Sequence, residues 1–168
     1  LRTGVFLMWN IQYERKTYMK EKHKLMYMEM AEIIAKQSYA KRLQVGSVAV
    51  KDNRIISIGY NGTPPGMDNN CEEYYEDVEY KDGNISKVKK QRTKKEVIHA
   101  EMNLIYKLAR DGESGKGADL FITHSPCFEC SKAILSVGFR SVYYRDEYRD
   151  KDGLELLKTN GVYIEQMS

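Results

Sequence analysis

The chain has 168 residues, of which 42% are hydrophobic and 30% charged, and its formal net charge is +3. That length fits one domain with a buried core, since domains commonly contain about 100–200 residues. The composition argues against a membrane protein, because no apolar run approaches the roughly 18 residues of a membrane-spanning helix. The first residues do not follow the order of a signal peptide, and the small net charge does not indicate a nucleic-acid-binding protein.

The chain begins with a segment that has no clear pattern. Residues 1–22 mix apolar, aromatic and basic side chains, so we expect an extension outside a single domain formed by residues 23–168. From Lys24 to Lys41, apolar residues recur at helical spacing, which predicts one helix with a wide core-facing stripe. The expected stripe contains Leu25, Met28, Ala31, Glu32, Ala35 and Tyr39.

Two β-rich runs follow, at residues 45–50 and 54–60, joined by three polar residues. This arrangement predicts an antiparallel hairpin. A dense cluster of turn-forming residues comes next, from Asn61 to Gly66. Such a loop either only reverses the chain or also presents backbone groups to a ligand, because glycine permits close approach.

Residues 67–96 form a charged insertion. Its first half is acidic and contains tyrosines, its second half is basic from Lys87 to Lys95, and Asp82-Gly83 between them is a hairpin signal. One interpretation is a solvated hairpin whose two arms neutralise each other. The other is a basic arm that binds a phosphate or a neighbouring subunit.

Helices and strands alternate after the insertion. One hairpin followed by repeated β–α steps predicts a mixed sheet with helices on both faces. In the first of these helices we expect Ile98, Met102, Ile105 and Ala109 on one side. The expected helices are 97–110, 127–138 and 154–159, and the expected strands are 118–124, 141–145 and 162–164.

Two short motifs in this region carry the chemistry. His99 and Glu101 form a His-x-Glu motif, and Cys127 and Cys130 form a Pro-Cys-x-x-Cys motif. A close cysteine pair with a His-x-Glu indicates metal binding rather than disulfides, and free thiols favour the reducing cytoplasm. One imidazole and two thiolates suit zinc and leave a fourth position open. The combined pattern is typical of zinc-dependent nucleobase deaminases.

Both motifs lie at expected helix starts, where helix dipoles favour thiolates and a bound hydroxide. Glu101, on the same helical turn as the His99 ligand, is then the residue that would move protons from water to the ring and the leaving amine. The alternative is a structural zinc, which is usually closed by four protein ligands. Cys71 or His124 would have to supply the fourth.

The chain resembles deoxycytidylate (dCMP) deaminases of bacteria and bacteriophages. The resemblance lies in these two motifs, in the runs 42–46 and 59–64, and in Asn103. The resemblance covers about residues 25–164. It implies a three-layer α/β/α cytidine deaminase-like fold with a central mixed five-stranded sheet, and conversion of dCMP to dUMP for thymidylate synthesis. It also implies a homohexamer that dCTP with Mg²⁺ activates and dTTP inhibits, in the host cytoplasm if the chain is virus-encoded.

The resemblance also assigns roles to single residues. Ala100 would donate its backbone N–H to the pyrimidine O2, Arg42 would bind the phosphate, and Tyr148 would close over the base. For Arg42 and Arg149 the alternative is a surface cation, and for Tyr148 it is packing. The implied substrate contacts are Arg42, Asn61, Ala100, Asn103, Tyr148 and Arg149, and the implied effector residues are Tyr60, Asn61, Gly62 and Arg110.

Three further points remain open in the sequence. His124, at a strand end beside the motif, either lines the pocket or only packs, and Arg110 is either regulatory or an ordinary helix-end cation. Some phage relatives have a second zinc site, but Cys71 is the one spare cysteine here, so we expect one zinc per chain. A deaminase of tRNA or single-stranded DNA is the competing function, because the basic run and its tyrosines suit such a substrate.

Overall fold

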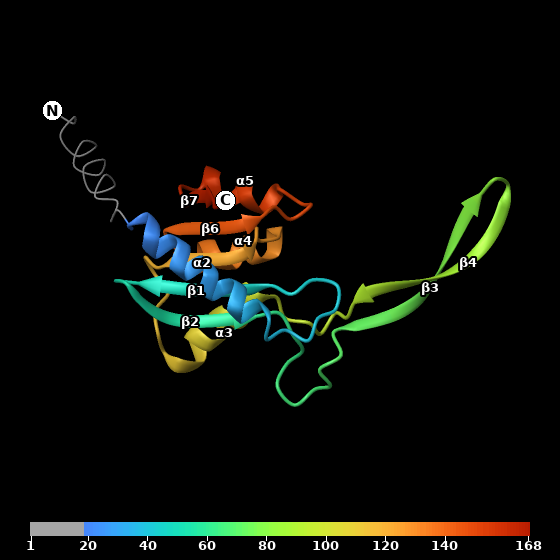
Figure 1. Cartoon of the computed structure of the whole chain (residues 1–168), viewed down its shortest axis with the longest axis horizontal. Coiled ribbons are helices and arrows are strands. Elements are labelled where there is room, and N and C mark those ends of the chain that lie inside the picture. Colours follow the sequence, from blue (N-terminus) through green and yellow to red (C-terminus); the bar gives the residue numbers. More distant parts are fainter. Residues whose placement is uncertain (1–18) are drawn as a thin grey trace.

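A five-stranded sheet organises the computed structural model, which describes residues 19–168 (Figure 1). Its strand order is β2-β1-β5-β6-β7. β1 pairs antiparallel with both β2 and β5, whereas β5, β6 and β7 run parallel. The expected mixed five-stranded sheet is therefore confirmed. Its strands are β1 (Gly46–Lys51), β2 (Arg54–Tyr60), β5 (Asp119–His124), β6 (Ser141–Asp146) and β7 (Tyr163–Gln166).

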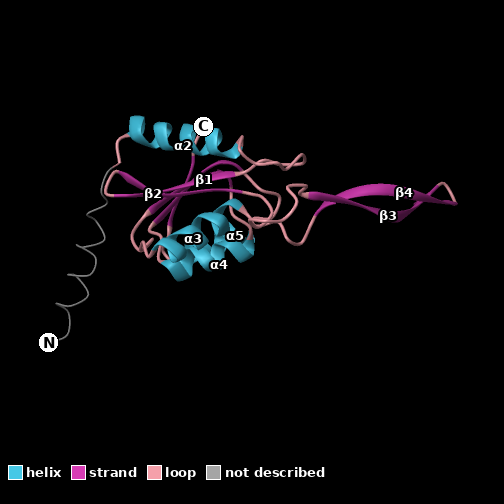
Figure 2. Ribbon diagram, turned by 90° about the horizontal axis from the view of Figure 1, so that it is seen from below, coloured by secondary structure: helices cyan, strands magenta, loops and turns pink. Residues whose placement is uncertain are grey.

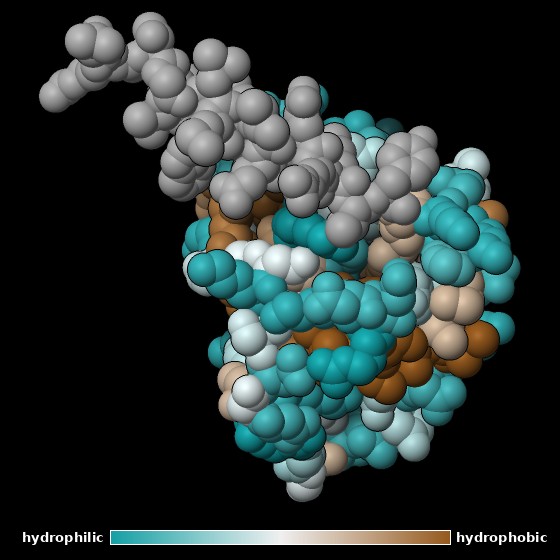
Figure 3. Space-filling model, turned by 90° about the vertical axis from the view of Figure 1, so that its left-hand side faces the viewer, coloured by the Kyte–Doolittle hydropathy of each residue, from teal (hydrophilic) through white to brown (hydrophobic). Residues whose placement is uncertain are grey.

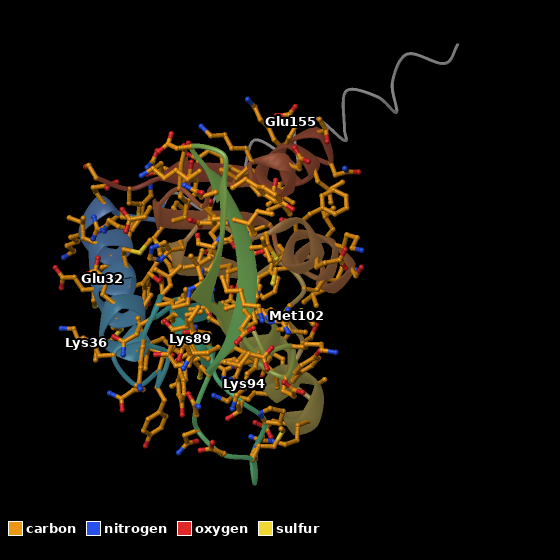
Figure 4. All side chains as sticks on the ribbon, turned by 90° about the vertical axis from the view of Figure 1, so that its right-hand side faces the viewer. Glu32, Lys36, Lys89, Lys94, Met102 and Glu155 are labelled. Atoms are coloured by element: carbon orange, nitrogen blue, oxygen red, sulfur yellow. The ribbon has the colours of Figure 1, made fainter. Side chains whose placement is uncertain are left out.

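Helices cover both faces of this sheet, as Figure 2 shows. One face carries α2 (Glu21–Ala35), alone among the described helices. The other face carries α3 (Ala100–Asp111), α4 (Phe128–Val137) and α5 (Asp152–Thr159). In the view from the hairpin side, Glu32 and Lys36 lie at the α2 side of the body and Met102 at the α3 side (Figure 4). The chain thus has the three-layer α/β/α architecture that the sequence predicted.

The core forms two clusters, one on each face of the sheet. Strands β1 and β5 supply both, because successive side chains of a strand point to opposite faces. Val48 and Phe121 pack in the α2 layer with Met28, while Ala49 and Leu120 pack on the opposite face. All of these side chains are fully buried. Because helices cover both faces of these central strands, residues 45–50 and 118–124 are nearly continuous apolar runs in the sequence.

Two strand glycines allow helices to approach the sheet closely. A Cβ atom built at Gly46 would lie 2.1 Å from the Ala31 carbonyl oxygen of α2. One built at Gly59 would lie 2.1 Å from the Ala100 carbonyl oxygen of α3. Because Ala100 is the first residue of α3, the contact with Gly59 fixes the start of that helix against β2.

The charged insertion forms a long hairpin that projects from the body (Figures 1 and 2). Its strands are β3 (Glu72–Lys81) and β4 (Asn84–Thr93). Asp82 and Gly83 between them both have positive φ, at 51° and 78°, as a two-residue hairpin turn requires. The hairpin predicted from Asp-Gly is therefore confirmed.

Opposite charges on the two hairpin strands face each other. Lys90 Nζ lies 2.8 Å from Asp77 Oδ2 and 3.1 Å from Glu79 Oε1. Arg92 Nε lies 2.7 Å from Glu73 Oε1. These pairs favour the interpretation in which the arms neutralise each other. The cross-strand register also places four exposed apolar side chains on one face of the hairpin, namely Tyr74, Val78, Tyr80 and Ile85.

The first helix is shorter than predicted. It ends at Ala35 instead of Lys41, and Tyr39, expected in its core stripe, is 64% exposed. The buried Ser38 side chain offers the chain a competing set of bonds: its hydroxyl donates to the Asn61 carbonyl and accepts from the Ala40 N–H. Most of the expected extension, residues 1–18, lies outside the described residues, but Glu21 and Lys22 belong to α2.

The predicted start of the second helix was wrong, and the predicted apolar side matches the buried side only in part. The helix begins at Ala100 because Ile98 is extended and exchanges two backbone hydrogen bonds with Gly62, at 2.8 and 3.1 Å. Leu104 and Leu108 are the buried apolar residues of the side that faces the sheet, and Ile105 packs against the same core while partly buried. Apolar residues occur on several sides of this helix, so spacing alone did not identify the buried one.

The surface of the body away from the hairpin is mostly hydrophilic, with apolar patches between polar side chains (Figure 3). Within residues 19–168, every helix is too short or too polar to cross a membrane.

Candidate active site

The site lies where two helices begin on the same face of the sheet. His99 is the N-cap of α3 and Cys127 the N-cap of α4, both with extended backbones. Cys130 follows in the first turn of α4. The extended Ile98–Gly62 bridge on one side and β5 on the other bring the two helix starts together. His99 Nδ1 lies 3.6 Å from Cys127 Sγ and 3.5 Å from Cys130 Sγ.

These three side chains fit a zinc ion. Zinc–sulfur bonds of about 2.3 Å and zinc–nitrogen bonds of about 2.0–2.1 Å at a tetrahedral angle place nitrogen about 3.5 Å from sulfur. The observed separations of 3.6 and 3.5 Å match that value, and the three ligand atoms all lie within 4.8 Å of one another. Among the described residues, His99, Cys127 and Cys130 form the one such group.

A fourth protein ligand is not found in the part of the chain that the structure describes. Neither Cys71 nor His124 belongs to the ligand group. The Cys71 thiol is buried and donates to the Asn69 carbonyl. His124 instead lies 3.8 Å from Asp146. The donor set therefore matches zinc sites that keep one position open, as catalytic sites do.

Without metal, hydrogen bonds among the three ligands shift their pKa values, and zinc would displace the protons that remain on them. A hydrogen bond from the Cys130 thiol lowers the pKa of Cys127 to about 4, although burial opposes the shift. The same bond, together with burial, raises the pKa of Cys130. The hydrogen bond between His99 and Cys127 raises the pKa of His99 against the effect of burial.

Glu101 lies in the first turn of α3, two residues beyond His99. Its side chain is buried, and that burial raises the pKa of the carboxyl to about 7, while the charge of His99 acts in the opposite direction. A carboxyl with a pKa near neutrality can both accept and donate a proton. The buried Glu101 is thus suited to general acid–base chemistry.

One cavity joins Glu101 to the zinc ligands and to several predicted contacts. Ala100 and Asn61 line it, and so do His124 and Tyr148. The Ser125 hydroxyl accepts the Tyr148 N–H at 2.7 Å, which places the loop after β6 at the cavity. The full lining is Ala40, Leu43, Val45, Asn61, Glu72, Thr93, Val97, His99, Ala100, Glu101, His124, Ser125, Cys127 and Tyr148.

Other predicted contacts lie beside the cavity lining. Arg42 is exposed, and its guanidinium donates to Thr93, which lines the cavity, at 3.4 Å. Arg149 is also exposed, with its guanidinium 5.8 Å from the Tyr148 ring. Asn103 donates to the Tyr60 carbonyl at 2.8 Å, which ties α3 to the end of β2.

The predicted effector residues are spread over a wider area. Tyr60 ends β2, with Lys107 Nζ 5.6 Å from its ring, and Gly62 pairs with Ile98. Arg110 lies at the far end of α3, where it is exposed and pairs with Asp111 at 2.8 Å. None of these three residues belongs to the cavity lining among the described residues.

Glu72 lines the cavity but was not singled out in the sequence. It is 4% exposed, and its Oε1 accepts the backbone N–H groups of Lys41 and Arg42 at 2.8 and 3.2 Å. Its sequence neighbours are surface acids of the hairpin. No local signal separates Glu72 from them, because its burial depends on the distant loop at residues 38–44.

A family comparison agrees with this geometry. Residues 20–146 match the model of the cytidine and deoxycytidylate deaminase zinc-binding region. The chain is also 30% identical to the deoxycytidylate deaminase of Enterobacteria phage T4, over 82% of this chain and 86% of that protein. The chain belongs to the deoxycytidylate deaminase family. The chain also resembles ComE operon protein 2 of Bacillus subtilis, with 33% identity over 84% of this chain and 69% of that protein.

A solved structure of a family member shows the same fold. It is the dCMP deaminase of the cyanophage S-TIM5 in complex with dCMP and dUMP. That protein is 42% identical, with a TM-score of 0.76, over 89% of this chain and all of that chain. The predicted cytidine deaminase-like fold is thereby confirmed.

Proposed function

We propose that this chain is a zinc-dependent hydrolase that converts dCMP and water to dUMP and ammonia. The observation that carries the proposal is the shared cavity, in which the buried Glu101 carboxyl adjoins the ligand group of His99, Cys127 and Cys130. The choice of dCMP is supported by family relatives named deoxycytidylate deaminases and by the cyanophage complex with dCMP and dUMP.

In this reaction a C4–O bond forms and the C4–N bond of the exocyclic amine breaks. His99, Cys127 and Cys130 would hold a zinc ion, which would lower the pKa of a bound water from about 15.7 to about 7. Glu101 would take one proton from the attacking water and give it to N3 of the ring. It would then take the remaining proton from the new C4 hydroxyl and pass it to the departing amine, which leaves as ammonia. The pKa of about 7 for its carboxyl suits both directions of transfer.

The positions of these residues support the binding roles that the resemblance implies. Ala100 is buried at the start of α3, where backbone N–H groups have no acceptor within the helix, so its N–H would donate to the pyrimidine O2. Arg42 and Arg149, at the cavity edge, would bind the phosphate, since a guanidinium offers two parallel donors. Tyr148 would cover the base. Asn61, Asn103 and His124 would complete the nucleotide contacts.

A polynucleotide substrate is less well supported. It would need a broad basic surface that binds many phosphates. The basic hairpin strand instead pairs with its acidic partner, for example Lys87 with Glu76 at 3.2 Å and Arg92 with Glu73 at 2.7 Å.

Regulation and assembly complete the proposal. We propose activation by dCTP with Mg²⁺ and inhibition by dTTP, through the region of Tyr60, Asn61, Gly62 and Arg110, in a homohexamer. The reaction would supply dUMP for dTMP synthesis in the cytoplasm, where free cysteines stay reduced. Rates measured against dCMP concentration with and without each effector, together with the mass in solution, test this part.

The main experiment compares substrates and one variant. The zinc-loaded protein should release ammonia from dCMP and not from a single-stranded cytosine oligonucleotide. Glu101→Gln should keep its zinc and lose about 10²- to 10⁴-fold in kcat, because the proton transfers lose their carrier. Glu129→Gln is the matched control, since Glu129 lies between the two cysteines but is exposed. A fully active Glu101→Gln protein, or turnover of the oligonucleotide alone, would contradict the proposal.

A further inference from the structure

Glu72 places a carboxylate with one unused oxygen beside the cavity. The residue is 4% exposed, and its Oε1 is occupied by the backbone N–H groups of Lys41 and Arg42. Its Oε2 is buried and has no hydrogen-bond partner among the described residues. An unsatisfied buried acceptor destabilises the folded protein, and more so when it is charged. A donor that arrives with a ligand would remove that destabilisation.

The chemistry of the proposed substrate limits which donor this can be. A carboxylate accepts hydrogen bonds only. In dCMP at neutral pH, the donors are essentially the exocyclic amine and the sugar 3′-hydroxyl. The amine has to lie at the zinc ligands and Glu101, where the C4–N bond breaks. The 3′-hydroxyl is then the donor that remains for Glu72.

Charge around the cavity fits the same orientation. A carboxylate beside the phosphate would repel it, so the phosphate has to point away from Glu72. Arg42 supplies a positive charge for the phosphate near the Glu72–Thr93 pair. Its backbone N–H is held by Glu72 Oε1, whereas its guanidinium extends to Thr93 at the cavity edge. One carboxylate would thus bind the sugar and position the loop that carries a phosphate ligand.

We infer that Glu72 accepts a hydrogen bond from the 3′-hydroxyl of the substrate and makes the enzyme selective for a nucleotide with that hydroxyl. The inference rests on the proposed function. It predicts discrimination at a part of the sugar remote from the reacting C4 atom.

Three substrates test it on the wild-type protein. They are dCMP, 2′,3′-dideoxycytidine monophosphate, which lacks the hydroxyl, and its 3′-fluoro analogue, whose fluorine accepts but does not donate. Wild-type kcat/KM should fall by about tenfold or more without the hydroxyl, because a buried polar group is left unpaired. The kcat/KM of the fluoro analogue should be lower still, because its fluorine, an acceptor, would face the carboxylate, which is also an acceptor.

Glu72→Gln supplies the complementary measurement. The amide keeps an oxygen for the Lys41 and Arg42 N–H groups and turns an N–H donor toward the sugar. In this variant, kcat/KM for the fluoro analogue should therefore exceed that for the dideoxy nucleotide. This reverses the order of the two analogues in the wild-type protein. Glu73→Gln is the control, because Glu73 lies on the opposite face of β3, outside the cavity lining, and pairs with Arg92. It should keep the wild-type order.

The outcomes separate this inference from the proposed function. If the wild-type protein turns over dCMP and the dideoxy nucleotide equally well, Glu72 does not bind the hydroxyl, whereas deamination stands. If Glu72→Gln lowers kcat/KM for all three substrates by the same factor, Glu72 only anchors the loop at residues 38–44. If the wild-type protein turns over none of them, the proposed function fails first and this assignment with it.

Discussion

At the residue scale, Asn61 links β2 to the loop that leads into β1. Its Oδ1 accepts the Val45 N–H at 2.8 Å, and its Nδ2 donates to the Leu43 carbonyl at 2.9 Å. Its own carbonyl accepts the Ser38 hydroxyl at 2.7 Å. The residue is 8% exposed and also lines the cavity. A role in binding the nucleotide would therefore come in addition to a structural role.

The structural role can be measured with Asn61→Asp. The carboxylate keeps the acceptor for Val45 but places an oxygen against the Leu43 carbonyl, which leaves two buried acceptors facing each other. We expect the free energy of unfolding to fall by about 1–3 kcal/mol in urea denaturation. Asn160→Asp is the control, because it also removes an Nδ2 donor to a backbone carbonyl, that of Leu156, but at an exposed site. Equal losses in both variants would show that Asn61 does not hold the loop.

At the scale of elements, the contact between β2 and α3 positions the zinc ligands. Ser47 Oγ donates to the Ala100 carbonyl at 2.9 Å, which ties β1 to the first residue of α3. Gly59 in β2 lies under that same carbonyl. Because His99 immediately precedes Ala100, the sheet determines where the imidazole lies.

Gly59→Ala should damage this contact. The added Cβ would lie 2.1 Å from the Ala100 carbonyl oxygen and 2.7 Å from the Leu104 nitrogen, and these are backbone atoms of a packed helix. We expect the free energy of unfolding to fall by at least about 1–3 kcal/mol, as in other overpacked cores, and zinc to bind more weakly. Urea denaturation and a zinc titration against a coloured chelator measure both effects.

Gly62→Ala is the matched control for that prediction. A Cβ at Gly62 would come no closer than 4.0 Å, to the Tyr60 ring, so the same substitution finds space three residues further on. If the two variants have the same stability and zinc affinity, close packing of α3 on β2 is not what positions His99.

The strands and turns were predictable from the sequence because their signals are local. Apolar β-rich runs mark the strands, and Asp82-Gly83 and Gly138 mark a turn and a helix end, all from residues within a few positions. The start of α3 was not predictable, because Ile98 pairs with the distant Gly62. The end of α2 likewise depends on the bond between Ser38 and Asn61.

The zinc ligands and Glu101 were predictable for a different reason. His99, Glu101, Cys127 and Cys130 form two short motifs whose residue types and spacing indicate one chemistry. Glu72 lies in no motif. It reaches the cavity because the hairpin base packs against the loop at residues 38–44, a contact between segments that are about 30 residues apart in the chain.

At the scale of the whole molecule, the chain consists of a packed body and a projecting hairpin. Strands β3 and β4 pack on each other along their length. The base is attached to the body by the Glu72 bonds to Lys41 and Arg42. The Lys94 N–H donates to the Cys71 carbonyl at 2.9 Å and closes the base of the hairpin itself. The body should therefore fold without the outer hairpin.

Replacing residues 74–91 by Asn-Gly tests this division. The register pairs Glu73 with Arg92, so a two-residue turn closes the shortened hairpin in its natural register, and Glu72 and Thr93 stay in place. We expect the free energy of unfolding to stay within about 0.5 kcal/mol of the parent value, as for changes outside the core. Activity on dCMP should also be retained, because the removed lysines are largely paired within the hairpin. If the shortened protein loses dCMP turnover but keeps deoxycytidine turnover, the hairpin binds the phosphate; if it fails to fold, the body depends on the arm.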